Sequence, residues 1–317
     1  MGKIDRLTRN AEEVVTLEEL KKLIETKTKP RVYVGYEPSG KIHLGHVITV
    51  NKLLDLQAEG FEVTVLLADL HAYLNQKGTL EEVRELASYN KRCFEALGLT
   101  SARYVYGSDF ELEEDYTLNV LKLARETTLN RAKRSMDEIS RSAQNPVVSQ
   151  MVYPLMQAID IATLGIDIAV GGIDQRKIHM LARDTLPKLG LNSPVCIHTP
   201  ILIGLDGKKM SSSERNYISV DESKEVIRKK IGGAYCPAGK EDNPILSLYK
   251  FLIFPAVNRE GKEMMIERPK KFGGDISYKS YGELERDFTK KEIHPMDLKN
   301  CAADFLDRLL TSTRDIH

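Results

Sequence analysis

The amino-acid sequence predicts an α/β fold, in which a parallel β-sheet covered by helices is followed by a smaller, mainly helical module. Up to about residue 220, apolar runs of strand length alternate with amphipathic stretches of helical length, the order that successive βαβ units produce. Beyond that point the apolar spacing is helical. With 317 residues, of which 42% are hydrophobic, the chain can bury one large core and one smaller core.

The first element expected is a helical hairpin over residues 4–27. Thr16 and Glu19 have the spacing of a capping box, and the leucines and isoleucine that follow share one helical face. We interpret this segment as a packing element for the domain that follows.

Residues 31–50 combine a strand, a turn and the start of a helix. β-Branched and aromatic residues predict a short buried strand, Pro38 and Gly40 predict the turn, and His43-Leu44-Gly45-His46 leads into apolar residues at helical spacing. Such a turn directs backbone NH groups and the positive end of a helix toward an anion. The two imidazoles add side-chain donors there, so this stretch predicts an anion-binding site.

Two further strands are predicted at 61–68 and 102–106, with a helix at 79–98 between them. Asp69 and His71 come directly after the first of these strands. Because ligands bind beyond the carboxyl ends of strands in open α/β sheets, both side chains are candidates for a binding site. His71 also has a simpler interpretation as a hydrogen-bonded structural histidine.

Residues 109–141 form an acidic turn followed by a long helical stretch rich in Lys and Arg, including Arg134. Most of these charges are interpreted as a solvated face, because exposed charges are the rule in globular proteins. Cations along one helix can also meet phosphates, so a nucleic-acid contact is the second interpretation.

Residues 151–163 predict a buried helix with one polar face. Tyr153, Gln157 and Asp160 fall at i, i+4 and i+7, which places all three on one side of a helix that is otherwise apolar. Polar groups along a buried stripe need partners. The spacing leaves two interpretations open, a satisfied structural network and a binding site.

Two glycine-bearing loops follow. After a strand at 166–170, the residues GGIDQR at 171–176 repeat the order of strand, glycines, acidic residue and helix, which presents a carboxylate to ribose hydroxyls. The loop at 207–213 carries two lysines and three serines, and therefore many donors for phosphate. As bare patterns, both loops are also compatible with a plain surface role.

Composition limits the remaining possibilities. Lys plus Arg equals Asp plus Glu, 46 each, so a nucleic acid would have to be bound by local basic patches. The four cysteines form no CxxC pair, which argues against a zinc site and a disulfide framework and favours a reducing cytoplasm. We expect no membrane span and no signal peptide, because apolar runs of the required kind are lacking.

Taken together, these motifs resemble those of the class I aminoacyl-tRNA synthetases. HLGH at 43–46 matches the first signature of that family, and KMSSS at 209–213 matches the second, with serine where many members have a second lysine. The similarity extends from the first helix to Asp297 and is greatest to tyrosyl-tRNA synthetases of the archaeal and eukaryotic type. That closer similarity rests on GGIDQRK at 171–177 and on Tyr33, Tyr153, Gln157 and Asp160.

The resemblance implies a division into domains. A Rossmann-like catalytic domain would span residues 1–225, with an inserted segment at about 80–140 for dimerisation and acceptor-stem binding, and with the signature loop at 207–213. A mainly helical anticodon-binding domain would span residues 226–317. A homodimer in the cytoplasm is expected.

The resemblance also implies an activity. L-Tyrosine and ATP would react to tyrosyl-adenylate and pyrophosphate, and the tyrosyl group would then pass to the 3′ end of the tRNA specific for tyrosine. Because the carboxylate of the amino acid can attack the α-phosphorus directly, positioning and electrostatic stabilisation must carry the rate. Mg²⁺ would accompany ATP, held by phosphates and water, and no protein metal ligands are expected.

The residue roles follow from matches to the family. The phenolic oxygen of the substrate would be bound by Tyr33 and Asp160, and its amino group and carboxylate by Tyr153, Gln157 and Gln175. The catalytic donors would be His43, His46 and Lys209. ATP would also be bound by Gly45, Asp174, Met210, Ser211 and Ser212. The tRNA would be bound at its acceptor stem by Arg134 and Arg176, and at its anticodon by Phe272, His294 and Asp297.

Two alternatives remain. A tryptophanyl-tRNA synthetase would share the fold and both signatures, but Tyr33 and Asp160 suit a phenol better. A catalytically silent paralogue that binds tRNA or a nucleotide would not need the intact HLGH sequence or Lys209. Exchange of pyrophosphate into ATP that depends on tyrosine separates the three possibilities.

Overall fold

The computed structural model describes residues 2–137, 147–208, 210 and 216–316. The chain packs into two compact units. The first consists of Met1–Gly40 and Lys52–Ile201, and the second of Lys41–Asn51 and Leu202–His317. Helix α3 (Leu44–Ala58) therefore begins in the second unit and continues in the first.

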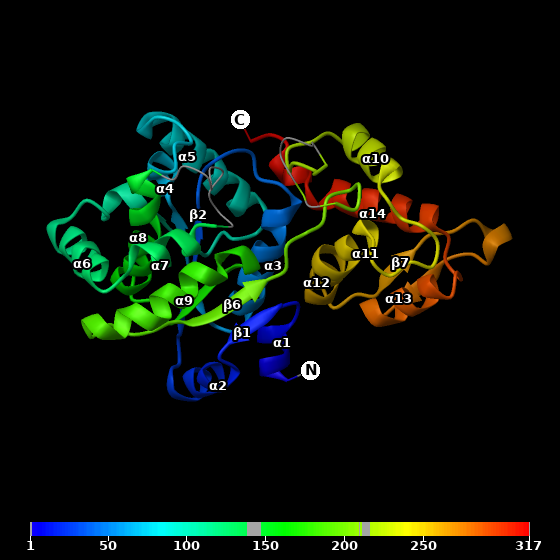
Figure 1. The fold of residues 1–317 in the computed structure, drawn as a ribbon. Coiled ribbons are helices and arrows are strands. Elements are labelled where there is room, and N and C mark those ends of the chain that lie inside the picture. The colour runs from blue at the N-terminus through cyan, green and yellow to red at the C-terminus, as the bar shows by residue number, and fades with distance from the viewer. Residues whose placement is uncertain (1, 138–146, 209, 211–215, 317) are drawn as a thin grey trace. The chain divides into compact units, whose positions relative to one another are not determined.

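A six-stranded sheet forms the centre of the first unit (Figure 1). Its order is β1 (Glu13–Val15), β6 (Val195–Thr199), β5 (Ile168–Gly172), β2 (Arg31–Tyr36), β3 (Glu62–Leu67) and β4 (Arg103–Tyr106). All neighbouring strands are parallel except β1, which runs antiparallel to β6. The predicted parallel α/β sheet is confirmed.

The central strands are buried because their residues are apolar on both faces. In β3 all residues but the first are buried, and in β2 the buried positions are Val32, Tyr33, Val34 and Tyr36. Parallel sheets have helices on both faces, so continuous apolar runs are the expected pattern. Tyr33 lies in register with Thr64 of β3 and Ala169 of β5, so its backbone is held from both sides in the middle of the sheet.

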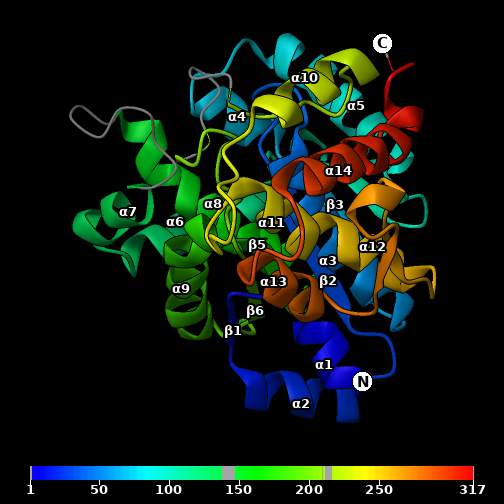
Figure 2. The ribbon, with the colours of Figure 1, turned by 90° about the vertical axis from the view of Figure 1, so that its right-hand side faces the viewer.

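The helices of the first unit fill the segments between strands. They are α1 (Lys3–Thr8), α2 (Leu17–Thr26), α4 (Asp69–Leu74), α5 (Leu80–Ala96), α6 (Glu114–Arg125), α7 (Leu129–Ser135), α8 (Val148–Thr163) and α9 (Arg176–Thr185). Helices α6 to α9 form one packed group, visible in both views (Figures 1 and 2). A core of buried side chains from α6, α8 and α9 packs against the sheet.

Two predictions for this unit were wrong. The segment 4–27 is no helical hairpin, because β1 separates α1 from α2 and pairs with β6. A strand of three residues is too short to show a period, and only its distant partner stabilises it. The long helical stretch after residue 109 is divided, since α6 ends near Glu126 and Thr128 caps α7. The predicted capping box of Thr16 and Glu19 is confirmed.

The second unit is mainly helical, as predicted. It contains α10 (Lys224–Gly233), α11 (Pro244–Leu248), a π-helical turn (Tyr249–Ile253), α12 (Phe254–Arg259), α13 (Tyr281–Thr289) and α14 (Pro295–Leu309). The antiparallel pair β7 (Met264–Ile266) and β8 (Ile276–Tyr278) adds a hairpin. The start of α3 is fixed here, because the Leu44 NH donates to the Ile218 carbonyl over 3.0 Å. Among the described residues, no helix combines the length and apolarity needed to cross a bilayer.

Candidate active site

A cavity of about 110 Å³ opens at the carboxyl ends of β2 and β3 in the first unit. The strands, the start of α4, the helix α8 and the turn after β5 all contribute to its wall. Its lining consists of Tyr33, Gly35, Glu37, Ala68, His71, Tyr153, Gln157, Asp160 and Gln175. All five residues predicted to bind the amino acid are therefore brought together in one cavity.

Helix α8 supplies the polar wall of this cavity. Tyr153, Gln157 and Asp160 are all buried, with 5%, 7% and 0% of their surface exposed. The helical spacing that suggested a shared face thus brings three polar side chains to one cavity. Gln157 Nε2 donates to Gln175 Oε1 over 3.2 Å, which joins the helix to the turn that follows β5.

Tyr33 presents a neutral phenol. Its side chain is only 1% exposed. Burial raises its pKa well above the ordinary value, and the charges of Asp160 and Glu111 add to this rise. Gly35 makes room for the ring, since a Cβ at this position would lie 2.5 Å from the hydroxyl oxygen of Tyr33. The Tyr33 hydroxyl therefore keeps its proton at neutral pH.

Asp160 has one satisfied and one unsatisfied oxygen. Its Oδ1 accepts a hydrogen bond from the Tyr116 hydroxyl over 2.6 Å. Its Oδ2 has no hydrogen-bond partner among the described residues, although it is buried. Burial raises the pKa of this carboxyl group and the charge of Glu111 raises it further, whereas His71 and the Tyr116 hydrogen bond oppose the rise. A buried acceptor without a partner suits a ligand that carries a hydroxyl group.

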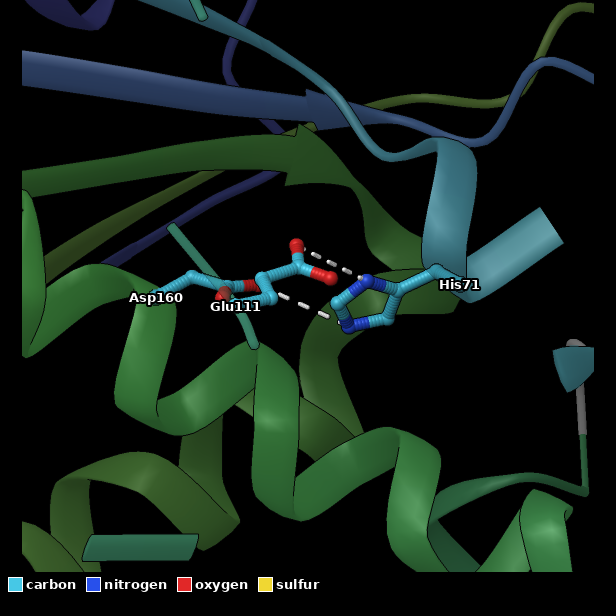
Figure 3. A group of neighbouring side chains, drawn as sticks. All are labelled: His71, Glu111 and Asp160. Carbon is cyan, nitrogen blue, oxygen red and sulfur yellow. Dashed lines mark ion pairs between the residues drawn. The ribbon is translucent and has the colours of Figure 1, made fainter. Parts of the chain in front are cut away.

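His71 lies beside two carboxylates, and Figure 3 shows both of them on the same side of the imidazole. Its Nδ1 is 3.4 Å from Glu111 Oε1, and its Nε2 is 3.5 Å from Asp160 Oδ2. Burial by itself lowers the pKa of the imidazole, but the charges of Glu111 and Asp160 outweigh burial and raise the pKa to about 9. His71 is therefore a cation at neutral pH.

Sequence reasoning missed three residues around this cavity. Glu37 lines it and accepts a 2.9 Å hydrogen bond from Asn75 Nδ2. Glu111, assigned to the acidic turn, is 2% exposed, and Tyr116 is 3% exposed. One signal was available for Glu111, because it follows β4 and so belongs to the same carboxyl edge of the sheet as Asp69 and His71.

The HLGH histidines lie in the second unit, at the start of α3. Each ring accepts a backbone NH at Nδ1: the Gly45 NH donates to His43 over 3.1 Å, and the His43 NH donates to His46 over 3.2 Å. Burial lowers the pKa of His43 to about 4. Burial and the charge of His43 lower the pKa of His46 to about 3. Both rings are thus neutral at pH 7 and carry their proton on Nε2, where each can donate a hydrogen bond.

Gly45 cannot be replaced without displacing a histidine. A Cβ there would lie 2.9 Å from His43 Cε1 and 3.7 Å from Met210 Sδ. Met210, predicted to bind ATP, therefore lies near Gly45. Three predicted residues of the same loop, Lys209, Ser211 and Ser212, lie outside the described residues.

The remaining predicted residues are not part of the cavity lining. Asp174 follows β5 and lies beside Gly172, where a Cβ would be 2.5 Å from its Oδ1. Arg176 forms a bidentate ion pair with Glu13 at 2.8 to 3.0 Å. Arg134 is exposed on α7.

The predicted anticodon residues lie in the second unit. Phe272 is 61% exposed in the connection between β7 and β8. His294 caps α14 and accepts the Met296 NH at Nδ1 over 3.2 Å. Asp297 lies in the first turn of the same helix. An exposed aromatic ring together with a partly exposed carboxylate is typical of surfaces that bind unpaired bases.

Comparisons with known proteins agree with this geometry. A family model described as tRNA synthetases class I (W and Y) matches residues 25–311. A protein of Methanococcoides burtonii, named tyrosine–tRNA ligase, is 62% identical over 319 residues, which cover 100% of this chain and 99% of that protein. The crystal structure of tyrosyl-tRNA synthetase from Archaeoglobus fulgidus, complexed with L-tyrosine, is 62% identical with a TM-score of 0.95 and covers 98% of each chain. A tryptophanyl-tRNA synthetase from Aeropyrum pernix K1 shares the fold, with a TM-score of 0.75 at 21% identity over 94% of this chain and 80% of that chain.

Proposed function

The chain belongs to the tRNA synthetases of class I for tryptophan and tyrosine, and from this premise we propose how its residues divide the work of a tyrosine–tRNA ligase. It activates L-tyrosine with ATP to tyrosyl-adenylate and pyrophosphate, and it transfers the tyrosyl group to the 3′ end of its tRNA. The tryptophan-specific relative is only 21% identical, whereas several relatives named tyrosine–tRNA ligase are about 60% identical over the full chain.

The observation that supports tyrosine as the substrate is the buried Oδ2 of Asp160, which accepts no hydrogen bond from the described residues. Asp160 lines the cavity, and Tyr33 adds a phenol that keeps its proton. In this proposal both bind the hydroxyl group of substrate tyrosine. Phenylalanine would leave the buried groups unpaired, which costs roughly 10⁴ to 10⁵ in discrimination.

The α-amino group and carboxylate of the substrate are assigned to Tyr153, Gln157 and Gln175. The amide pair of Gln157 and Gln175 offers further donors and acceptors, because each amide uses only part of its capacity in their mutual hydrogen bond. These are suitable partners for an α-amino group and a carboxylate. This assignment rests on their place in the cavity lining and on the family resemblance.

ATP is the second substrate, and the HLGH histidines are assigned to the step in which it reacts with tyrosine. When the tyrosine carboxylate attacks the α-phosphorus, negative charge grows on the phosphate oxygens. The two Nε2–H groups are neutral donors that stabilise such charge without a proton transfer. Gly45 lies beside His43 and near Met210, and the proposed ATP set is completed by resemblance with Lys209, Ser211, Ser212 and Asp174. Mg²⁺ would bind the phosphates and water, since oxygen ligands of this kind suit its octahedral geometry.

The tRNA contacts are proposed in both units. Arg134 and Arg176 would meet the acceptor stem, and Phe272, His294 and Asp297 the anticodon. The exposure of Arg134 and Phe272 supports these roles. We accordingly retain residues 1–225 as the catalytic domain and 226–317 as the anticodon-binding domain. The division by compactness differs, because it assigns residues 41–51 and 202–317 to the second unit.

A cytoplasmic homodimer is also proposed. The segment at about 80–140 exposes several large apolar side chains to solvent in the single chain, which is typical of a surface that a second copy covers. They are Leu112, Leu118, Leu121 and Leu129, exposed by 71%, 46%, 59% and 70%.

One assay tests the function directly. Purified protein is given ATP, Mg²⁺ and labelled pyrophosphate with tyrosine, tryptophan or phenylalanine in turn. Exchange of label into ATP with tyrosine alone is the expected result. Equal or faster exchange with tryptophan would assign the chain to the other branch of the family, and no exchange with any of the three would identify a silent paralogue.

A further inference from the structure

Three buried ionisable groups meet beside the cavity of the first unit. His71 comes from α4, Glu111 from the turn before α6, and Asp160 from α8. Their side chains are 2%, 0% and 0% exposed. Both carboxylates lie on the same side of the imidazole, each near a different ring nitrogen (Figure 3). We refer to these three residues as the His71 cluster.

The His71 cluster is held by charge more than by regular hydrogen bonds. Both ring nitrogens, both Glu111 oxygens and Asp160 Oδ2 are buried without a hydrogen-bond partner among the described residues. Buried carboxylates are costly unless a cation compensates them. The imidazole is the group placed to do so, and the ring of Tyr153 packs edge-on against it at 4.6 Å and fixes its plane.

We propose that His71 is a positioning residue for substrate selection, which as a cation beside Glu111 and Asp160 favours the ionised form of Asp160 and so leaves its Oδ2 ready to accept a hydrogen bond from the phenol of tyrosine. The inference rests on the proposed contact between Asp160 and the substrate hydroxyl. It adds a second task to a residue that also lines the cavity.

The charges around the ring support this role. The groups that face His71 are Glu111, Asp160 and, farther away, Glu37, together with the ring of Tyr153. Burial favours the neutral imidazole, but the three carboxylates outweigh burial and bring the pKa to about 9. Burial and Glu111 drive the pKa of Asp160 upward, and His71 is the charged group that opposes this rise. Removal of the cation takes away the charge that favours the ionised form of Asp160, which is the form that can only accept a hydrogen bond.

A metal ion is the competing explanation for the same three residues, since their donor atoms lie within 4.8 Å of one another. A shared ion would need one imidazole nitrogen and both carboxylates to converge on a single point. Here the two carboxylates are near different ring nitrogens, Glu111 near Nδ1 at 3.4 Å and Asp160 near Nε2 at 3.5 Å. This arrangement favours the imidazolium itself as the cation.

The test measures how selection depends on pH. The ratio of kcat/KM for tyrosine to that for phenylalanine is determined by pyrophosphate exchange from pH 6.5 to 9.5 for the wild type, His71→Gln and Glu111→Gln. His179→Gln is the matched control, because it removes another buried imidazole of the same unit that does not line the cavity. Circular dichroism establishes that each variant is folded.

Each variant has its own expected profile. The wild-type ratio should stay level to about pH 8 and fall near pH 9, where the imidazolium loses its proton. His71→Gln should lower the ratio at pH 7 by at least about 10-fold, the effect of losing a hydrogen bond to a charged group. Glu111→Gln should keep most of the ratio at pH 7 but shift the alkaline fall by about one pH unit or more toward neutrality, because one of the charges that raise the pKa is gone. His179→Gln should follow the wild type.

Four results would overturn the proposal. The first is an unchanged ratio of kcat/KM values in His71→Gln. The second is a pH profile of that ratio in Glu111→Gln that coincides with the wild-type profile. This second result is decisive even if His71→Gln fails to fold. A wild-type ratio with no fall near pH 9 would contradict the cation. Stoichiometric metal in the purified protein, whose removal by chelator abolishes selection, would identify a metal site instead. If the wild type shows no exchange with tyrosine, the proposed function itself has failed, whereas selective exchange without these shifts defeats the role of His71 alone.

Discussion

The hydroxyl group of Tyr116 donates a 2.6 Å hydrogen bond to Oδ1 of Asp160 in the buried wall of the cavity. This bond leaves only Oδ2 for other partners. Because Tyr116 comes from α6 and Asp160 from α8, it also ties two helices together beside the site. The oxygen of Asp160 that is proposed to bind the substrate is therefore set by a residue that does not line the cavity.

Removal of this hydroxyl should cost stability. Tyr116→Phe leaves a buried carboxylate oxygen without its donor, and hydrogen bonds to charged groups contribute about 1.5 to 3 kcal/mol. The free energy of unfolding, measured by urea denaturation at pH 7.5, should fall by that amount. Tyr104→Phe is the matched control, because its half-buried hydroxyl donates to the neutral Leu99 carbonyl at 3.0 Å. A loss no larger than that of the control would show that the Asp160 contact is not a strong one.

Loss of a signature histidine should slow activation and spare tyrosine binding. His46→Ala removes one neutral donor from the proposed transition state, an effect of about 10² to 10³ in rate for groups of this kind. Single-turnover formation of tyrosyl-adenylate measures the rate, and equilibrium dialysis measures the dissociation constant of tyrosine. Thr49→Val, one turn along α3, controls for disturbance of the helix, since the Thr49 hydroxyl only donates to the His46 carbonyl. An unchanged rate in His46→Ala would remove His46 from the mechanism.

The pair of buried histidines on α9 and β6, His179 and His198, should make the fold sensitive to acid. Burial, together with the charge of His198, lowers the pKa of His179 to about 3, and His179 Nδ1 lies 3.0 Å from His198 Nε2. In the unfolded chain, the imidazole of His179 takes up a proton below about pH 6.5, whereas in the folded chain it stays neutral. The free energy of unfolding therefore falls as the pH drops below about 6.5.

Between pH 7 and pH 5 this single group should cost about 2 kcal/mol of unfolding free energy. In His179→Gln, the difference in unfolding free energy between pH 7 and pH 5 should be smaller by that amount, whatever the effect of the substitution on stability at pH 7. Urea denaturation at the two pH values measures both slopes. Equal slopes for the variant and the wild type would mean that His179 is not kept neutral by the fold.

The sequence predicts the parts of this molecule whose signals are local. The strand β2, the turn and the start of α3 follow from one continuous stretch, and the polar face of α8 follows from helical spacing. The rule that ligands bind at the carboxyl ends of strands placed His71 near the site before any contact was known. The resemblance to class I synthetases, now confirmed, supplied the candidate roles.

What the sequence does not predict depends on distant partners. The strand β1 forms only because Glu13, Val14 and Val15 pair with β6, almost 200 residues away. Glu111 belongs to an acidic turn in which most carboxylates are solvated, and nothing local distinguishes the one that enters the core. Its burial becomes intelligible only once His71 is seen beside it. The periodicity of a sequence does not show which charged side chains pair across the fold.

Asp160 is proposed to bind the hydroxyl group of the substrate, and the ratio of kcat/KM for tyrosine to kcat/KM for phenylalanine tests this contact most directly. The wild type should show a ratio of roughly 10⁴ to 10⁵, as expected of a site built to bind a hydroxyl group. Asp160→Ala, established as folded by circular dichroism, should lower the ratio at least about 100-fold. An Asp160→Ala variant that selects tyrosine by the wild-type factor would contradict the account.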